Sequence, residues 1–181
     1  MEEITLQKFN EVLDALEKGE LRVAEKVDGE WKVNRWVKEV ILAGFKLGAV
    51  KEASGKMEQI RTILAKRPEG FAVLSGNDDD TLTMMQDGAD GVISVASNVC
   101  PAEMSAFVKA AAQEEWEKAE ELEARLHPLF EALFVEPNPI PGKAAMAQLG
   151  LMENSLRLPL VPALLETEEL MKNVMDALWK K

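Results

Sequence analysis

The pattern of apolar and polar residues changes near residue 48, and each side of that change predicts a different kind of structure. Before it, apolar residues at helical spacing flank a stretch in which apolar and polar residues alternate around Asp28 and Gly29. An Asp-Gly pair between two alternating runs is the strongest short-range signal for a β-hairpin. The first part is therefore predicted to be a helix over residues 4–16 that ends at Gly19, a hairpin over residues 21–33 and a helix over residues 35–47.

After that point, short apolar runs alternate three times with amphipathic stretches. This alternation predicts three parallel βα units, and short apolar strands bounded by Gly and Pro fit a barrel or a doubly wound sheet. The predicted strands cover residues 48–51, 71–75 and 91–96, and the predicted helices after them cover residues 57–65, 81–87 and 102–112. From residue 114 the pattern predicts helices alone, over residues 116–134 (bent or interrupted near Pro128), 143–149 and 166–179.

Composition narrows the class of function. The chain has 181 residues, 20.0 kDa and 47% hydrophobic residues, enough for a packed core in one or two small domains. Its net charge of -11 argues against binding to nucleic acid or to an anionic membrane surface. The acidic, amphipathic N-terminus predicts no signal peptide, and no apolar run is long enough to span a bilayer.

Cysteine and histidine are each present once, as Cys100 and His127. A single cysteine excludes an internal disulfide and is compatible with a reducing cytosol, so a cytoplasmic location is predicted. Because these two residues are the only strong nitrogen or sulfur ligands, neither a metal nor another cofactor is predicted. His127 is expected to be a surface or capping residue, and Cys100 an unreactive residue at a helix entry. Asp78, Asp79 and Asp80 directly precede a predicted helix, where acidic residues cap the helix more often than they bind a metal.

Lys51 is the strongest candidate for chemistry. It lies in an apolar, strand-like run that ends in a glycine turn at Gly55. A lysine held at the end of a buried strand loses solvation, and only the neutral amine attacks the carbonyl of a keto acid. A lysine beside a strand end is more often a solvated surface residue, however, so the position alone does not identify a Schiff-base lysine.

From about residue 48 to residue 181 the chain resembles the C-terminal half of dihydrodipicolinate synthase, a (β/α)8 barrel of the pyruvate-dependent aldolase superfamily. The resemblance is carried by Val50-Lys-Glu-Ala-Ser-Gly55, Leu74-Ser-Gly-Asn-Asp78, Gly91-Val-Ile-Ser-Val-Ala-Ser-Asn98, Phe134-Val-Glu-Pro-Asn-Pro-Ile-Pro141 and Leu156-Arg-Leu-Pro-Leu160. It implies that Lys51 forms an imine with pyruvate and that Gly76 lines the pyruvate pocket. It also implies that the main-chain carbonyl of Ile93 approaches the bound keto acid.

The first 47 residues resemble the N-terminal domain of tetrahydrodipicolinate N-succinyltransferase. This resemblance is carried by Leu21-Arg-Val-Ala-Glu-Lys-Val-Asp-Gly-Glu-Trp31 and by Trp36-Val-Lys-Glu-Val-Ile-Leu42. Both families serve lysine and diaminopimelate synthesis, so the chain is predicted to be a fusion. Its predicted parts are the helix–hairpin–helix segment over residues 1–47, half-barrel βα units over residues 48–113 and a helical region over residues 114–181.

The resemblance also implies that much of the catalytic machinery is missing. It places the lysine strand sixth of eight, and it assigns a threonine–tyrosine proton relay and a carboxylate-binding arginine to the absent half. The chain contains no tyrosine, so it is predicted to be a pyruvate lyase relative that is catalytically incomplete alone. Two alternatives stay open: oligomerisation restores imine formation at Lys51, or the chain is a non-catalytic, self-associating module. Because three strands cut from a barrel expose two sheet edges, a homo-oligomer is expected.

Overall fold

The computed structural model describes residues 11–12, 14–16, 18, 20, 24–27, 30–34, 36–37, 39–40 and 48–180. The chain divides into two compact units. One comprises Met1–Val50 with Arg67–Ala72, and the other comprises Lys51–Lys66 with Val73–Lys181. The division of the chain predicted at residues 47 and 113 stays a prediction.

The first unit contains the predicted hairpin. Strands β1 (Ala24–Val27) and β2 (Glu30–Val33) pair antiparallel, with Val27 opposite Glu30. Helical residues at 11–12, 14–16, 36–37 and 39–40 lie within the two predicted helices, and Val12, Val37 and Val40 from these segments are buried together. The rest of both predicted helices, residues 19, 21–23 and 28–29 lie outside the described residues.

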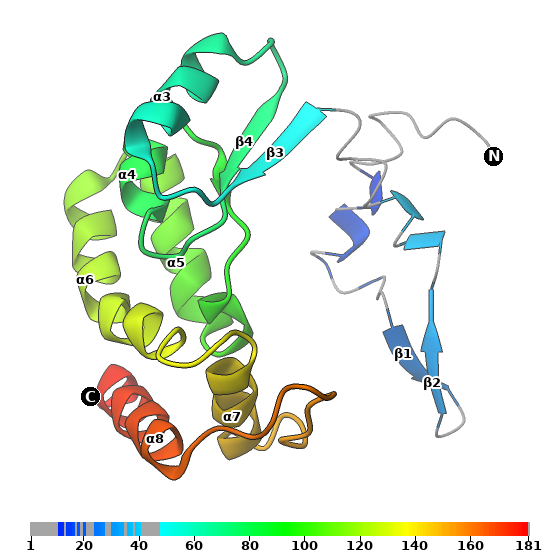
Figure 1. Ribbon diagram of the computed structural model, residues 1–181. Coiled ribbons are helices and arrows are strands. Elements are labelled where there is room, and N and C mark those ends of the chain that lie inside the picture. The colour runs from blue at the N-terminus through cyan, green and yellow to red at the C-terminus, as the bar shows by residue number, and fades with distance from the viewer. Residues whose placement is uncertain are drawn as a thin grey trace. The chain divides into compact units, whose positions relative to one another are not determined.

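Three strands form the sheet that carries the candidate site (Figure 1). They are β3 (Ala49–Glu52), β4 (Ala72–Ser75) and β5 (Gly91–Val92), in that order across the sheet. β4 and β5 are parallel, and Figure 1 shows β3 running in the same direction as β4. The helices after the strands are α3 (Met57–Lys66), α4 (Thr81–Gln86) and α5 (Pro101–Ala112). The three predicted βα units and the α/β fold class are confirmed.

The third strand is shorter than the predicted run over residues 91–96. Its ladder stops because the Asp78 carboxylate accepts hydrogen bonds from the backbone N–H groups of Val95 and Ala96, at 3.0 and 2.9 Å. Residues Ala96–Asn98 then form a short 3-10 helix, η1. A contact with the loop after β4, rather than local propensity, therefore ends the strand.

Three further helices complete the second unit: α6 (Trp116–Ala132), α7 (Ile140–Gln148) and α8 (Leu165–Trp179). α6 continues through Pro128 without interruption. A proline inside a helix removes one hydrogen bond and costs about 3 kcal/mol. Leu126, Leu129, Phe130 and Leu133 are all buried around it, and burial of each such side chain contributes about 1.5–3 kcal/mol. Packing therefore offsets the cost of the proline.

The core of this unit lies between α5, α6 and α8. Phe107 on α5, Leu129 on α6 and Met171 on α8 are fully buried in one apolar cluster. α5 packs against α6, and α8 packs against both α6 and α7, as Figure 1 shows. Trp179 Nε1 donates a hydrogen bond of 2.6 Å to Glu103 Oε1 and so joins the end of α8 to the start of α5. No helix in the described ranges is long and apolar enough to cross a membrane.

Cys100 lies directly before α5 with 1% of its surface exposed. Burial, with smaller contributions from the carboxylates of Glu103 and Asp78, raises the pKa of its thiol to about 12.

At pH 8 a thiol with that pKa is roughly 0.01% thiolate, whereas a thiol of ordinary pKa in the unfolded chain is roughly a quarter thiolate. We expect the native protein to react with a disulfide reagent at least about 1,000-fold more slowly than the protein in denaturant. Similar rates in the two conditions, followed by absorbance, would contradict the buried position.

Candidate functional site

The candidate site lies at the carboxyl ends of the three parallel strands. Lys51 is in β3, Gly76 directly follows β4 and Ile93 directly follows β5. The Gly76 N–H donates to the Glu52 carbonyl at 2.7 Å, and the Ile93 N–H donates to the Ser75 carbonyl at 2.8 Å. These bonds continue the ladder one residue past the strands and bring all three predicted residues to one end of the sheet. In parallel α/β domains this end is where ligands and reacting groups gather.

Gly76 is required by its contact with the lysine strand. A Cβ atom at position 76 would lie 2.5 Å from Ala53 Cβ and 2.9 Å from Lys51 Cε. It would also lie 3.1 Å from the Glu52 carbonyl oxygen. Only glycine lets the two backbones approach this closely while the Lys51 side chain passes over position 76.

The environment of Lys51 differs from the sequence-based expectation. The side chain is exposed, while Ala49 and Val50 before it are half-buried. The expected loss of solvation is therefore wrong for this chain, because β3 is an edge strand of its sheet and no further strand covers it in the described ranges. Ile93 is likewise 36% exposed. Lys51 lies at the predicted end of a strand, but its side chain does not lose solvation as predicted.

Glu52, the residue after Lys51, is buried and points to the opposite face of the strand. Hydrogen bonds from the Ser54 hydroxyl, and then from the Ser54 backbone N–H at 2.7 Å, hold the pKa of Glu52 below its usual value. Gly55 follows with a left-handed φ of +66°, which confirms the predicted glycine turn. The ionised Glu52 carboxylate thus fixes the turn that ends the lysine strand and is not directed at the amine.

The three aspartates before α4, Asp78, Asp79 and Asp80, were predicted to cap this helix, but the N-cap residue Asp80 makes no capping hydrogen bond. Its carboxylate instead accepts from Asn77 Nδ2 at 2.7 Å. Asp78 is only 2% exposed and binds the backbone N–H groups of Val95 and Ala96. It therefore joins the loop after β4 to the segment after Ile93. One signal could have identified it, since it follows a strand at the carboxyl end where functional loops lie.

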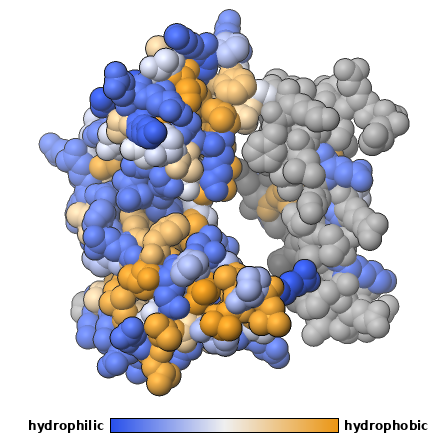
Figure 2. All heavy atoms as spheres, viewed as in Figure 1, coloured by the Kyte–Doolittle hydropathy of each residue, from blue (hydrophilic) through white to orange (hydrophobic). Residues whose placement is uncertain are grey.

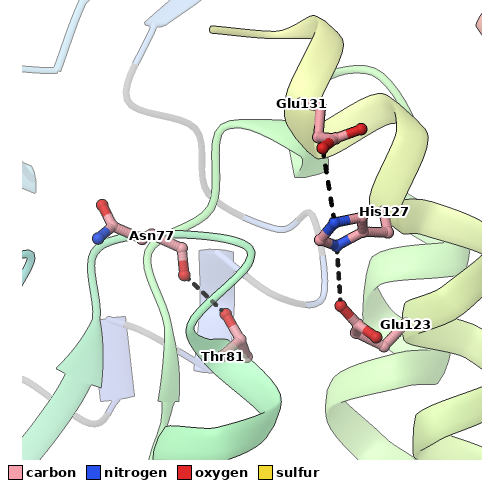
Figure 3. A network of polar contacts seen from close by, with 5 residues as sticks. All are labelled: Asn77, Thr81, Glu123, His127 and Glu131. Carbon is pink, nitrogen blue, oxygen red and sulfur yellow. Dashed lines mark hydrogen bonds and ion pairs between the residues drawn. The ribbon is translucent and has the colours of Figure 1, made fainter. Parts of the chain in front are cut away.

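Two side-chain hydroxyl groups also donate hydrogen bonds to the backbone of the loop after β4. The carbonyl oxygen of Asn77 accepts from Ser75 Oγ at 2.7 Å and from Thr81 Oγ1 at 3.0 Å, and the second bond is drawn in Figure 3. Ser75 and Thr81 are fully buried. The loop that follows Gly76 is thus fixed at both of its ends.

His127 lies on the surface of α6, as expected. Figure 3 shows it between two glutamates of the same helix, with Nδ1 3.1 Å from Glu123 Oε1 and Nε2 3.9 Å from Glu131 Oε1. Its side chain is 47% exposed. The described ranges contain no group of three or more histidine, cysteine, aspartate or glutamate side chains that could hold a metal ion.

Parallel βα units with polar residues gathered at the carboxyl ends of their strands place this chain in the α/β class of folds. Residues 37–178 match the model of the dihydrodipicolinate synthetase family, and the chain belongs to that family. Residues 1–47 match the model of the tetrahydrodipicolinate N-succinyltransferase N-terminal region. Both resemblances are thereby supported, and the synthase match begins earlier than residue 48.

Curated relatives of this chain include several 4-hydroxy-tetrahydrodipicolinate synthases. The enzyme of Thermotoga neapolitana is 50% identical over 129 residues, and that of Aquifex aeolicus is 44% identical over 127 residues. Each alignment covers 70% of this chain but only 44% and 43% of the relative. The chain therefore spans less than half the length of these relatives.

Solved structures show the same relation. Dihydrodipicolinate synthase from Aquifex aeolicus matches with a TM-score of 0.70 at 41% identity, over 75% of this chain and 49% of its own. The Thermotoga maritima enzyme matches with a TM-score of 0.68 at 45% identity, over 72% and 45%. The described fold is thus the fold of one part of a dihydrodipicolinate synthase.

The contacts of Gly76 give a first test of the site. We expect Gly76→Ala to lower the free energy of unfolding by about 1–3 kcal/mol. The added methyl group would force the end of the lysine strand, at Lys51 and Ala53, away from position 76. The matched control is Gly142→Ala on α7, where an added Cβ would meet only ordinary contacts at 3.7 and 4.0 Å. There we expect no loss, or a gain of up to about 1 kcal/mol. Equal effects in urea titrations would contradict the close approach.

Asp78 gives a second test. Asp78→Ala leaves two backbone N–H groups without their acceptor, and we expect it to lower the free energy of unfolding by about 2–4 kcal/mol. Asp78→Asn keeps an acceptor oxygen and should cost less. Asp79→Ala is the control, because Asp79 is exposed and such surface changes stay within about 0.5 kcal/mol. If urea unfolding showed the two alanine variants to be alike, the proposed link between the loops would be wrong.

Proposed function

We propose that this chain is a catalytically incomplete relative of 4-hydroxy-tetrahydrodipicolinate synthase that retains the pyruvate end of the site. The observation that carries the proposal is the passage of Lys51 over Gly76 at the carboxyl end of a parallel sheet. A structural neighbour adds support: a dihydrodipicolinate synthase from Acinetobacter baumannii, 32% identical with a TM-score of 0.70, was solved complexed with pyruvate. This alignment covers 72% of this chain and 45% of that one.

In this proposal the Lys51 amine attacks the carbonyl carbon of pyruvate, water leaves, and an imine forms. The backbone at Gly76 lines the pyruvate site, and the main-chain carbonyl of Ile93 approaches the keto acid. Because Lys51 is exposed, water competes for the same space and hydrolyses the imine. Little imine therefore accumulates on the chain alone, so a reductant is needed to trap it.

The same proposal explains why we expect no useful synthase turnover. Positioned proton donors and acceptors typically contribute about 100- to 10,000-fold to a rate, and positioning of reactants contributes more. The chain has no tyrosine for a proton relay and spans 44% of its Thermotoga neapolitana relative. Loss of these contributions together lowers the rate of aldol chemistry by several orders of magnitude.

Two further features belong to the proposal. The match of residues 1–47 to the succinyltransferase N-terminal model supports a fusion of two proteins of lysine and diaminopimelate synthesis. One structural neighbour, 45% identical with a TM-score of 0.70, is described as the first monomeric dihydrodipicolinate synthase variant. A monomer is thus presented as new in this family, which supports self-association of this chain as well.

Borohydride trapping tests the imine. We expect pyruvate and borohydride to add one reduced pyruvate to the Lys51 peptide, identified by mass spectrometry, well above the level on other lysines. Lys51→Met should lose this adduct, while Lys56→Met, at an exposed lysine just beyond the same strand, should keep it. An adduct spread evenly over the surface lysines, unchanged in Lys51→Met, would refute the proposed role.

A further inference from the structure

Asp78 and Glu52 are the only charged side chains that lie buried among the described residues. Elsewhere hydrophilic side chains cover much of the surface, as Figure 2 shows over α3 and α6. Glu52 directly follows Lys51 at the end of β3, and Asp78 lies two residues after Gly76 beyond the end of β4. Burial of a charge costs free energy. Two buried carboxylates at the same end of one sheet therefore point to a role in the site that lies there.

The two carboxylates bind different parts of the chain. Glu52 accepts a hydrogen bond from the Ser54 N–H, within its own turn. Asp78 instead reaches the segment after the neighbouring strand, where its Oδ2 atom accepts from the N–H groups of Val95 and Ala96 at 3.0 and 2.9 Å. A single oxygen atom thus joins the ends of two strands, which makes Asp78 the buried carboxylate that can affect the geometry across the site.

Ile93 is held on both sides by the loop after β4. Its N–H donates to the Ser75 carbonyl at 2.8 Å. Two and three residues later, Val95 and Ala96 are bound by Asp78. The carbonyl oxygen of Ile93 accepts no hydrogen bond from the described residues. The negative end of a fixed backbone dipole is therefore left for a ligand.

We propose that Asp78 is a positioning residue for the imine at Lys51, and that it acts by fixing the carbonyl group of Ile93. A protonated imine carries a positive charge, which a carbonyl oxygen held in place stabilises. Asp78 is only 2% exposed, and its Oδ1 atom is buried with no hydrogen-bond partner among the described residues. The carboxylate therefore acts through the main chain and not by contact with the keto acid. The inference rests on the proposed imine chemistry.

The trapped adducts measure this positioning. The measured quantity is the ratio of reduced pyruvate on Lys51 to reduced pyruvate on the exposed Lys56 of the same chain, determined by mass spectrometry at one subsaturating pyruvate concentration. A general change in reagent or pH affects both adducts, so the ratio reports on the site. We expect Asp78→Ala to lower the ratio at least about tenfold, since displacement of a reacting group by about 1 Å costs up to about 100-fold.

Two further variants separate positioning from stability. Asp78→Asn keeps an oxygen atom for both N–H groups, because Oδ2 alone makes both bonds. We expect its ratio to stay within about threefold of that of the unmodified chain. Met175→Ala removes a buried core side chain on α8, whose main neighbours are α6 and α7. It destabilises the fold, but we expect its ratio to stay unchanged. Circular dichroism defines a temperature at which all variants are folded.

Hydrogen exchange provides a measurement that needs no substitution. The unmodified chain is compared with the same chain carrying reduced pyruvate on Lys51. We expect the adduct to slow amide exchange of Val95 and Ala96 at least about threefold more than exchange on α6. A group that contacts the Ile93 carbonyl also restricts opening of the two bonds that follow it. Equal slowing in both places overturns the proposal, even if Asp78→Ala does not fold.

The outcomes distinguish this proposal from the one on which it rests. No excess adduct on Lys51 in the unmodified chain overturns the imine chemistry and the positioning role together. An adduct ratio that Asp78→Ala lowers no more than Met175→Ala overturns the positioning role alone. An equal loss in Asp78→Asn means that the charge acts and not the backbone hydrogen bonds, which overturns the route through Ile93.

Discussion

Two main-chain hydrogen bonds beyond the strand ends hold the candidate site together. The bond from Gly76 to Glu52 ties the second strand to the first, and the bond from Ile93 to Ser75 ties the third strand to the second. Neither bond depends on side-chain chemistry, but the first requires that position 76 carry no side chain. A single glycine thus decides whether the lysine strand can lie at the hydrogen-bonding distance from its neighbour. The side chains that define the chemistry follow from this backbone arrangement.

The elements of the second unit could be predicted from the sequence because their signals are local. Apolar runs bounded by glycine located the three strands, and helical periodicity located the helices within a few residues. The end of β5 could not be predicted, because the carboxylate that ends it belongs to Asp78, 17 residues before Val95. The continuity of α6 through Pro128 could not be predicted either, because it depends on which leucines the rest of the fold buries.

In the candidate site, too, local sequence predicted where a residue lies but not what surrounds it. The motif around Lys51 predicted its place at a strand end, but exposure depends on what covers the strand. The relatives are more than twice as long as the aligned part of this chain. Sequence therefore locates a candidate nucleophile, while the solvation of its amine depends on whether the edge of the sheet at β3 is covered.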